Sequence, residues 1–213
     1  MIAAFILLAA FFWLGHYVST HPEPGALARM ALAIRGHGNA IAWKFTQMGL
    51  AYVLAPLYLG LIVLAIFRPE WRVPALFAVS IALICWGTES AFQFFFARPR
   101  RLDWLIRHET AYSYPSGHAT ISTGFYFLCG LLALRSRLAP WLRYTIFIVL
   151  TCLTLGIMWS RVELAAHNIT DIIGGVMLAL AIILLGSAAL EFMGLARGDA
   201  ADSEASPHGG ARI

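Results

Sequence analysis

The most regular feature of the sequence is a series of apolar runs separated by short polar segments. A membrane-spanning helix needs about 20 mostly apolar residues. The runs that reach or approach this length lie at residues 1–18, 49–67, 73–97, 118–134, 143–160 and 168–192. The two shortest runs are flanked by residues that can extend a helix. The pattern therefore predicts an all-α fold, an integral membrane six-helix bundle.

The segments outside these runs are short and differ in character. Residues 19–48 open with a Pro-Glu-Pro-Gly turn, and residues 26–34 within them have a helical pattern that favours the membrane interface. The last residues are rich in Gly, Ala and Ser with scattered charges. We predict one membrane domain over 1–195, with an interfacial loop or helix at 19–48 and a disordered cytoplasmic tail at 196–213.

Composition agrees with a chain that has the bilayer as its solvent. Of 213 residues, 60% are hydrophobic and 12% are charged, too few charges to cover a soluble domain. The net charge is +4, yet Lys44 is the only lysine and no polar face gathers basic residues, which argues against nucleic acid as a partner. Arginine suits bidentate phosphate recognition, although the codon usage of a GC-rich genome explains its excess equally well. The three cysteines lie inside apolar runs without a CxxC pair and are interpreted as core residues.

The distribution of basic residues predicts the orientation of the bundle. With six spans, odd-numbered loops share one membrane face and even-numbered loops share the other with the tail. When Arg98, Arg100 and Arg161 are set aside as candidate site residues, the even face carries seven basic residues and the odd face five. The even face is therefore predicted to be cytoplasmic, and the odd loops to face the exterior or periplasm. Residues 1–14 lack a basic leader and a cleavage site, so they are interpreted as a retained span.

Polar clusters interrupt the apolar pattern at four predicted helix ends on the odd face. They lie at 93–101 after span three, 115–118 before span four, 160–161 after span five and 167–171 before span six. Ionisable residues at membrane depth are costly, so their convergence indicates a functional site at the outer membrane surface.

A histidine and an aspartate at the last of these ends suggest a nucleophile. His167 and Asp171 are four residues apart at a predicted helix start, so they are expected to share one helical face. A carboxylate that holds one imidazole nitrogen fixes the tautomer and leaves the other nitrogen free to attack. The alternative is a hydrogen-bonded interfacial histidine without a chemical role.

The other clusters offer groups that suit a phosphate. Ser116 is a natural N-cap, and Gly117 lets backbone amides approach an anion at a helix N-terminus. His118 beside them is a candidate general acid. Arg100 and Arg161 are forked donors that match phosphate oxygens. Each has a plainer interpretation, because Pro-Ser-Gly is a common turn and arginines near spans extend to the interface.

Together these residues resemble a known family. Pro115-Ser116-Gly117-His118, followed by Ser160-Arg161-x5-His167-x3-Asp171, is similar to the second and third signature motifs of the type 2 phosphatidic acid phosphatase superfamily. The resemblance covers roughly residues 49–192. It implies a metal-free site without a cofactor, in which His167 forms a phosphohistidine oriented by Asp171 and His118 protonates the leaving oxygen. Arg100, Arg161, Ser116 and the Gly117 amide are implied to hold the phosphoryl oxygens.

The first family motif departs from its pattern. The family has Lys, six residues and then Arg-Pro. The preferred register places Gln93 at the Lys position and Arg100 at the Arg, and a second register uses Arg98-Pro99 with Ala91 at the Lys position. Gln93 is then a candidate phosphate donor, and Arg98 or Arg101 is a candidate replacement for the lost charge. Glu89, one turn earlier, has either a structural or a catalytic role.

These features favour a lipid phosphatase that acts on isoprenoid diphosphate, phosphatidate-type lipids or lipid A in a bacterial inner membrane, with the lipid as its partner. A phosphotransferase with the same intermediate is an alternative, and so is a weakly active lipid-binding or transport relative. The sequence does not determine the lipid or the oligomeric state.

Overall fold

The computed structural model describes residues 1–36, 38–100 and 111–194, and the regular elements among them are all helical. The predicted all-α fold is confirmed. The predicted tail at 196–213 and Arg101 lie outside the described residues. In chain order the elements are α1 (Ile2–Thr20), α2 (Gly25–Ile34), α3 (Ala40–Gln47), α4 (Ala51–Phe67), η1 (Pro69–Trp71), α5 (Arg72–Phe96), α6 (Gly117–Ser122), η2 (Thr123–Phe127), α7 (Leu128–Leu134), α8 (Pro140–Glu163) and α9 (Ile169–Phe192).

The number of membrane-spanning units agrees with the prediction. Five helical units of the described chain are long and apolar enough to cross a membrane, with α6, η2 and α7 forming one of them. The pair α3 and α4, bent by 42°, gives a sixth. The predicted span at 49–67 corresponds to α4, and the unit extends backward through α3 across a break where Leu50 has an extended backbone. The chain is a multi-pass membrane protein.

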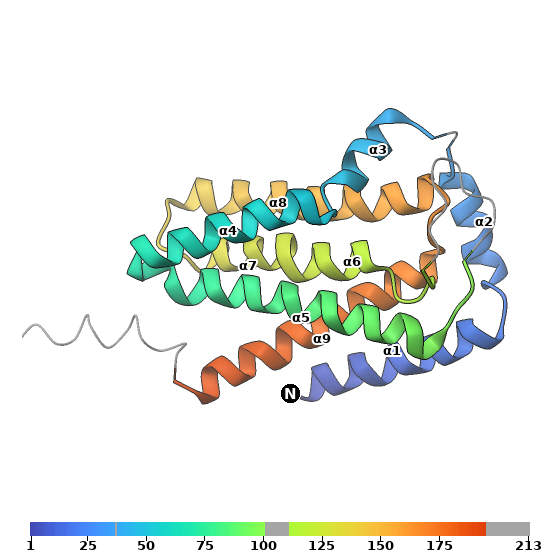
Figure 1. Cartoon of the computed structure of the whole chain (residues 1–213), viewed down its shortest axis with the longest axis horizontal. Helices are drawn as coiled ribbons and strands as arrows, with labels where there is room; N and C mark the ends of the chain where they lie inside the picture. The colour runs from blue at the N-terminus through green and yellow to red at the C-terminus, as the bar shows by residue number, and fades with distance from the viewer. Residues whose placement is uncertain (37, 101–110, 195–213) are drawn as a thin grey trace, which may run out of the picture.

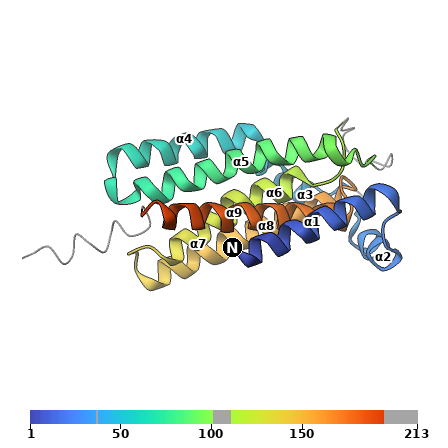
Figure 2. The ribbon, with the colours of Figure 1, turned by 90° about the horizontal axis from the view of Figure 1, so that it is seen from below.

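The spans run side by side along the long axis of the molecule (Figures 1 and 2). The helices α2 and α3 lie at the end of the bundle where α5 and α8 finish and α9 begins (Figure 1). A buried cluster of Leu54, Ala82, Ile121, Phe125 and Ile157 joins α4, α5, α6, η2 and α8 at the centre. Large apolar side chains on the outside of the bundle are exposed, as expected for a surface that contacts lipid.

Two adjacent glycines of α9 allow the chain before α6 to lie directly on that helix. A Cβ at Gly174 would lie 2.3 Å from the Tyr114 ring, and one at Gly175 would lie 2.8 Å from the Ser116 carbonyl oxygen. The Ser116 amide donates to the Asp171 carbonyl at 3.0 Å, and this bond fixes the same contact. The glycines therefore position the Pro-Ser-Gly-His turn against the start of α9.

Replacing Gly175 with alanine is expected to destabilise the protein by about 1–3 kcal/mol, because the new methyl group must displace backbone rather than a mobile side chain. Thermal unfolding in detergent measures the loss. Gly87→Ala on α5 is the matched control, because a Cβ there meets no atom within 4 Å. Equal melting temperatures for the two variants would contradict the close contact.

Candidate active site

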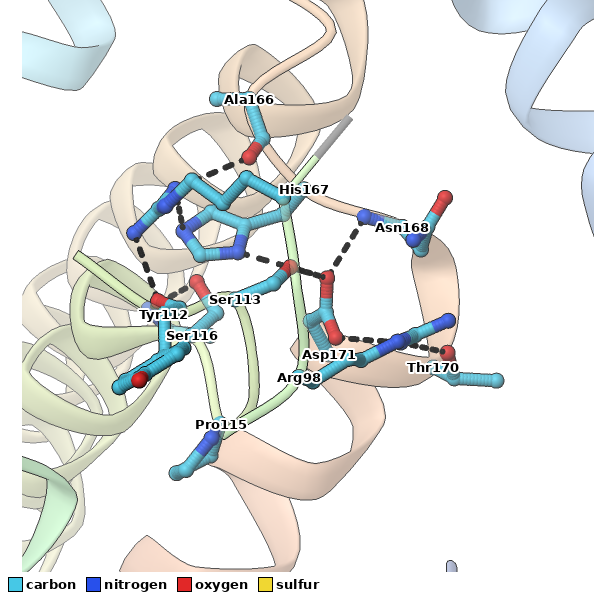
Figure 3. Close-up of polar contacts among 12 residues, drawn as sticks. Arg98, Tyr112, Ser113, Pro115, Ser116, Ala166, His167, Asn168, Thr170 and Asp171 are labelled. Atoms are coloured by element: carbon cyan, nitrogen blue, oxygen red, sulfur yellow. Dashed lines mark hydrogen bonds and ion pairs between the residues drawn. The ribbon is translucent and has the colours of Figure 1, made fainter. Parts of the chain in front are cut away.

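His167 lies between a carboxylate and a guanidinium in the turn that joins α8 and α9. Its Nδ1 is 3.5 Å from Asp171 Oδ2, and its Nε2 is 3.2 Å from Arg100 Nη1 (the contact with Asp171 is drawn in Figure 3). A guanidinium only donates hydrogen bonds, so Nε2 must accept one. The ring proton therefore sits on Nδ1, on the side of Asp171. This tautomer leaves a lone pair on Nε2, the nitrogen that faces Arg100.

The expectation that His167 and Asp171 share a helical face needs a correction. The helix α9 begins at Ile169 with Asn168 as its N-cap, so His167 precedes the helix. The backbone amide of His167 instead donates to the carbonyl of Arg161 at the end of α8, at 3.2 Å. Asp171 in the first turn of α9 points back toward the imidazole. The two side chains meet because a turn, and not a helical repeat, brings them together.

Asp171 is fully buried and accepts several donors. Its Oδ2 accepts from the Ser113 hydroxyl at 2.5 Å and from the Asn168 amide at 2.9 Å, and its Oδ1 accepts from Arg98 Nη1 at 2.5 Å (Figure 3). The bond from Asn168 also caps α9. These contacts fix the carboxylate, so its orientation toward His167 is built into the fold.

Arg100 is held over the imidazole by backbone carbonyls. Its guanidinium donates to the carbonyls of Ala111 at 2.7 Å, Ala166 at 3.0 Å and Tyr112 at 3.1 Å. The structure thus places Arg100 at Nε2 of His167, and its role in phosphate binding stays a prediction. A phosphate that approaches Nε2 meets this guanidinium first.

Arg98 has a different position from the one expected of a replacement for the missing lysine. Its Nη1 donates to Asp171 and, at 2.8 Å, to the Thr170 hydroxyl, and its Nη2 donates to Glu23 at 3.0 Å. The side chain is only 5% exposed. Arg98 is therefore shared between the carboxylates of Asp171 and Glu23 on the side of the site behind the histidine, and its role in phosphate binding stays a prediction.

Gln93 connects α5 to the turn before α6. Its amide nitrogen donates to Glu89 Oε2 at 2.9 Å and to the Pro115 carbonyl at 3.1 Å. Glu89 also lies against the turn, because a Cβ at Gly117 would be 2.9 Å from Glu89 Oε1. Both contacts support the structural interpretation of Glu89. Phosphate binding by Gln93 stays a prediction, and it requires the amide to leave one of these partners.

The turn before α6 has the predicted cap. Ser116 is the N-cap of α6 and its hydroxyl accepts from the Ala119 amide at 3.5 Å, so the cap prediction is confirmed. His118 follows in the first turn of α6, and its Nε2 contacts the Thr46 carbonyl at 3.2 Å. A carbonyl only accepts, so His118 carries a proton on Nε2. The ring lies within the electrostatic influence of Arg161 and His167.

Thr46 joins two predicted site residues and was not expected from the sequence. Its carbonyl contacts His118, and its hydroxyl accepts from Arg161 Nη1 at 2.6 Å. Thr46 lies near the end of α3, far along the chain from both partners, and it is 2% exposed. No motif marks it. It reaches the site because α3 lies against the ends of α6 and α8 that carry His118 and Arg161.

Burial and the adjacent guanidinium of Arg100 lower the pKa of His167 from 6.5 to about 4, although Asp171 acts in the opposite direction. The imidazole is therefore neutral at physiological pH, as a nucleophile requires. An unfolded chain would bind the proton near pH 6.5 and the folded chain near pH 4. Between these values the folded state loses stability as the pH falls.

The titration of His167 can be followed directly. In protein labelled with 13C at histidine Cε1, the resonance that disappears in His167→Ala is expected to titrate near pH 4. A midpoint near 6.5 would contradict the burial of the ring beside Arg100.

Comparison with known proteins places the chain among membrane phosphatases. The sequence matches the PAP2 superfamily over residues 61–192. The structure is similar to that of a transmembrane PAP2-type phosphatidylglycerolphosphate phosphatase from Bacillus subtilis, with a TM-score of 0.72 and 21% identity over 90% of this chain and 97% of that chain. At this identity the likeness shows a common fold. No curated protein matches the sequence.

Proposed function

The chain belongs to the PAP2 superfamily, and from this membership we propose that it hydrolyses a phosphate or diphosphate group of a lipid through a phosphohistidine intermediate. The observation that carries the proposal is the position of His167 between Asp171 and Arg100. One neighbour holds the ring proton, and the other faces the nitrogen that would attack.

The proposed reaction has two steps at the same phosphorus atom. In the first, the lone pair of His167 Nε2 forms a bond to phosphorus and the bond from phosphorus to the lipid oxygen breaks. Asp171 stabilises the positive charge that the imidazole acquires. His118, in its imidazolium form, gives its Nε2 proton to the leaving oxygen and becomes a neutral imidazole, which requires its Nε2 to exchange the Thr46 carbonyl for that oxygen. In the second step water attacks phosphorus, the bond from phosphorus to Nε2 breaks and returns its electron pair to His167, His118 accepts a water proton, and inorganic phosphate leaves.

The arginines account for phosphate binding in this proposal. Arg100 Nη1 contacts the lone pair of Nε2 in the absence of substrate. Phosphoryl oxygens are stronger acceptors than a neutral imidazole, so they would take over this donor and free the lone pair. Arg161, fixed by the Thr46 hydroxyl, and the turn at Ser116 and Gly117 would hold the remaining oxygens.

A lipid substrate is supported by the place of the site in the bundle. His167 and Asp171 lie where apolar spans begin and end, so a head group can reach them while its chains stay in the bilayer. The distribution of basic residues supports an orientation in which this end of the bundle faces away from the cytoplasm, the periplasm in a bacterial inner membrane. Lys44, exposed on α3 at the same end, tests the orientation: a membrane-impermeant amine reagent should label it in intact spheroplasts. Labelling only after lysis would reverse the orientation.

Phosphate release by purified protein in detergent tests the activity. Phosphatidate, phosphatidylglycerol phosphate, an isoprenoid diphosphate and lipid A are the substrates to compare, with and without EDTA. We expect inorganic phosphate from at least one lipid at a rate that EDTA does not change. Loss of activity with EDTA would contradict a metal-independent reaction. Transfer of labelled phosphate to a second lipid without free phosphate would identify a phosphotransferase, and binding without turnover would identify a lipid-binding protein.

A further inference from the structure

Glu23 reaches the site from a part of the chain that the family match does not include. It lies in the turn between α1 and α2, before the matched residues 61–192. Its side chain is 8% exposed. The carboxylate accepts from the Thr170 amide at 3.2 Å, from the Thr170 hydroxyl at 2.5 Å and from Arg98 Nη2 at 3.0 Å. A buried carboxylate with three donors is part of the internal structure and not a surface charge.

Arg98 is shared between two carboxylates. One terminal nitrogen donates to Glu23 and the other to Asp171, so the guanidinium lies between them. Two carboxylates and one guanidinium leave a net negative charge behind His167. Without Glu23, Arg98 and Asp171 would form a neutral pair. The pull of Asp171 on the Nδ1 proton of His167 would then be weaker, since the positive charge of Arg98 would act on Asp171 without compensation.

We propose that Glu23 is a positioning residue that holds Arg98 and offsets its positive charge, so that Asp171 stays directed at His167 as a strong hydrogen-bond acceptor. The proposal rests on the proposed function, in which His167 is the nucleophile. Glu23 compensates Arg98, Arg98 fixes Asp171, and Asp171 stabilises the cationic imidazole of the phosphohistidine. These contacts connect His167 and Asp171, through Arg98, to Glu23 in the turn after α1.

A purely structural role would have other consequences. Glu23 accepts from the amide of Thr170 in the first turn of α9, where an acidic group favours the helix dipole. If capping were its only role, a substitution would lower stability without changing the contact between His167 Nδ1 and Asp171. It would also have the same effect whether or not Arg98 is present.

The test is a double-mutant cycle of Glu23→Gln and Arg98→Met. Glutamine keeps the size of Glu23 but presents an N–H group where Arg98 and Thr170 need an acceptor. Two quantities are measured: the rate of phosphoenzyme formation from 32P-labelled phosphatidate and from a labelled isoprenoid diphosphate, and the 1H resonance of the His167 Nδ1 proton. The resonance needs no substrate. The matched control is Glu70→Gln in η1, where the side chain is 57% exposed and pairs with Arg68 at 3.5 Å.

We expect Glu23→Gln alone to slow phosphoenzyme formation by about tenfold, the effect of one pKa unit of lost electrostatic support, and to move the Nδ1 proton upfield. In the Arg98→Met background the same change should alter the rate by less than about twofold. Wild-type values for Glu23→Gln, or equal effects in both backgrounds, would overturn the proposal. If Glu23→Gln alone does not fold, a folded double variant supports coupling through Arg98, and an unfolded one overturns it.

Failure of this inference differs from failure of the proposed function. If His167 is not the nucleophile, His167→Ala keeps phosphate release, whatever Glu23→Gln does. If only the inference fails, His167→Ala is inactive while Glu23→Gln retains the wild-type rate and Nδ1 resonance.

Discussion

Replacing His167 with alanine is expected to reduce phosphate release by roughly 10⁴-fold or more, because it removes the imidazole that forms the covalent intermediate in the proposed mechanism. The imidazole is the group that lies between Asp171 and Arg100, with its Nε2 lone pair directed at Arg100. Binding of a lipid phosphate should be nearly unchanged, since the arginines stay in place. Initial rates and equilibrium binding of the same lipid separate the two effects.

His16→Ala is the matched control for this variant. His16 lies on α1 and is exposed, so its loss should leave the rate unchanged. Retained activity in His167→Ala would remove His167 as the nucleophile. Equal loss in both variants would point to a general effect of histidine replacement on folding.

Replacing Asp171 with asparagine is expected to lower the rate by roughly 10³–10⁴-fold, the loss typical of a histidine that loses its orienting carboxylate. The amide keeps the shape of the side chain but can present an N–H group to Nδ1, which favours the tautomer with the proton on Nε2. The nucleophilic lone pair then points away from the phosphate. Arg98 also loses one of its two carboxylate partners, so stability should fall as well.

Two measurements keep these effects apart. Ser113→Ala removes one hydrogen-bond donor to Asp171 but keeps the charge of the carboxylate. This variant should therefore lower the rate by less than about tenfold. The 15N shifts of His167 report which nitrogen carries the proton in folded Asp171→Asn. A folded variant with the wild-type tautomer and the wild-type rate would show that Asp171 does not orient His167.

Much of the fold follows from local properties of the sequence. The lengths of the apolar runs are sufficient to predict the spans, and α5, α8 and α9 differ from the prediction by only a few residues at their ends. The N-cap at Ser116 is equally local, since a serine before an apolar helix satisfies an exposed amide. The place of Thr46 beside the site, just before the break between α3 and α4, could not be predicted. Its partners lie on α6 and α8, far along the chain.

The site residues that share a motif could be predicted from the sequence. The residues whose position depends on tertiary contacts could not. His167 and Asp171 are close in sequence and in space, although a turn rather than a helix joins them. Arg98 and Arg100 are two residues apart, yet they bind opposite sides of the site, and no spacing rule distinguishes them. Nothing in the sequence marks Glu23 except its place in a Pro-Glu-Pro-Gly turn. Its role depends on contact with Arg98, 75 residues later in the chain.

Trapping of the phosphoenzyme tests the central proposal most directly. Protein is mixed with a lipid that carries 32P in its phosphate, quenched within the first turnover at alkaline pH, and digested for peptide mapping. The proposed mechanism predicts an alkali-stable, acid-labile label on His167 that is absent from His167→Ala. Label on a different residue, or full turnover by a protein that never carries the label, would contradict it.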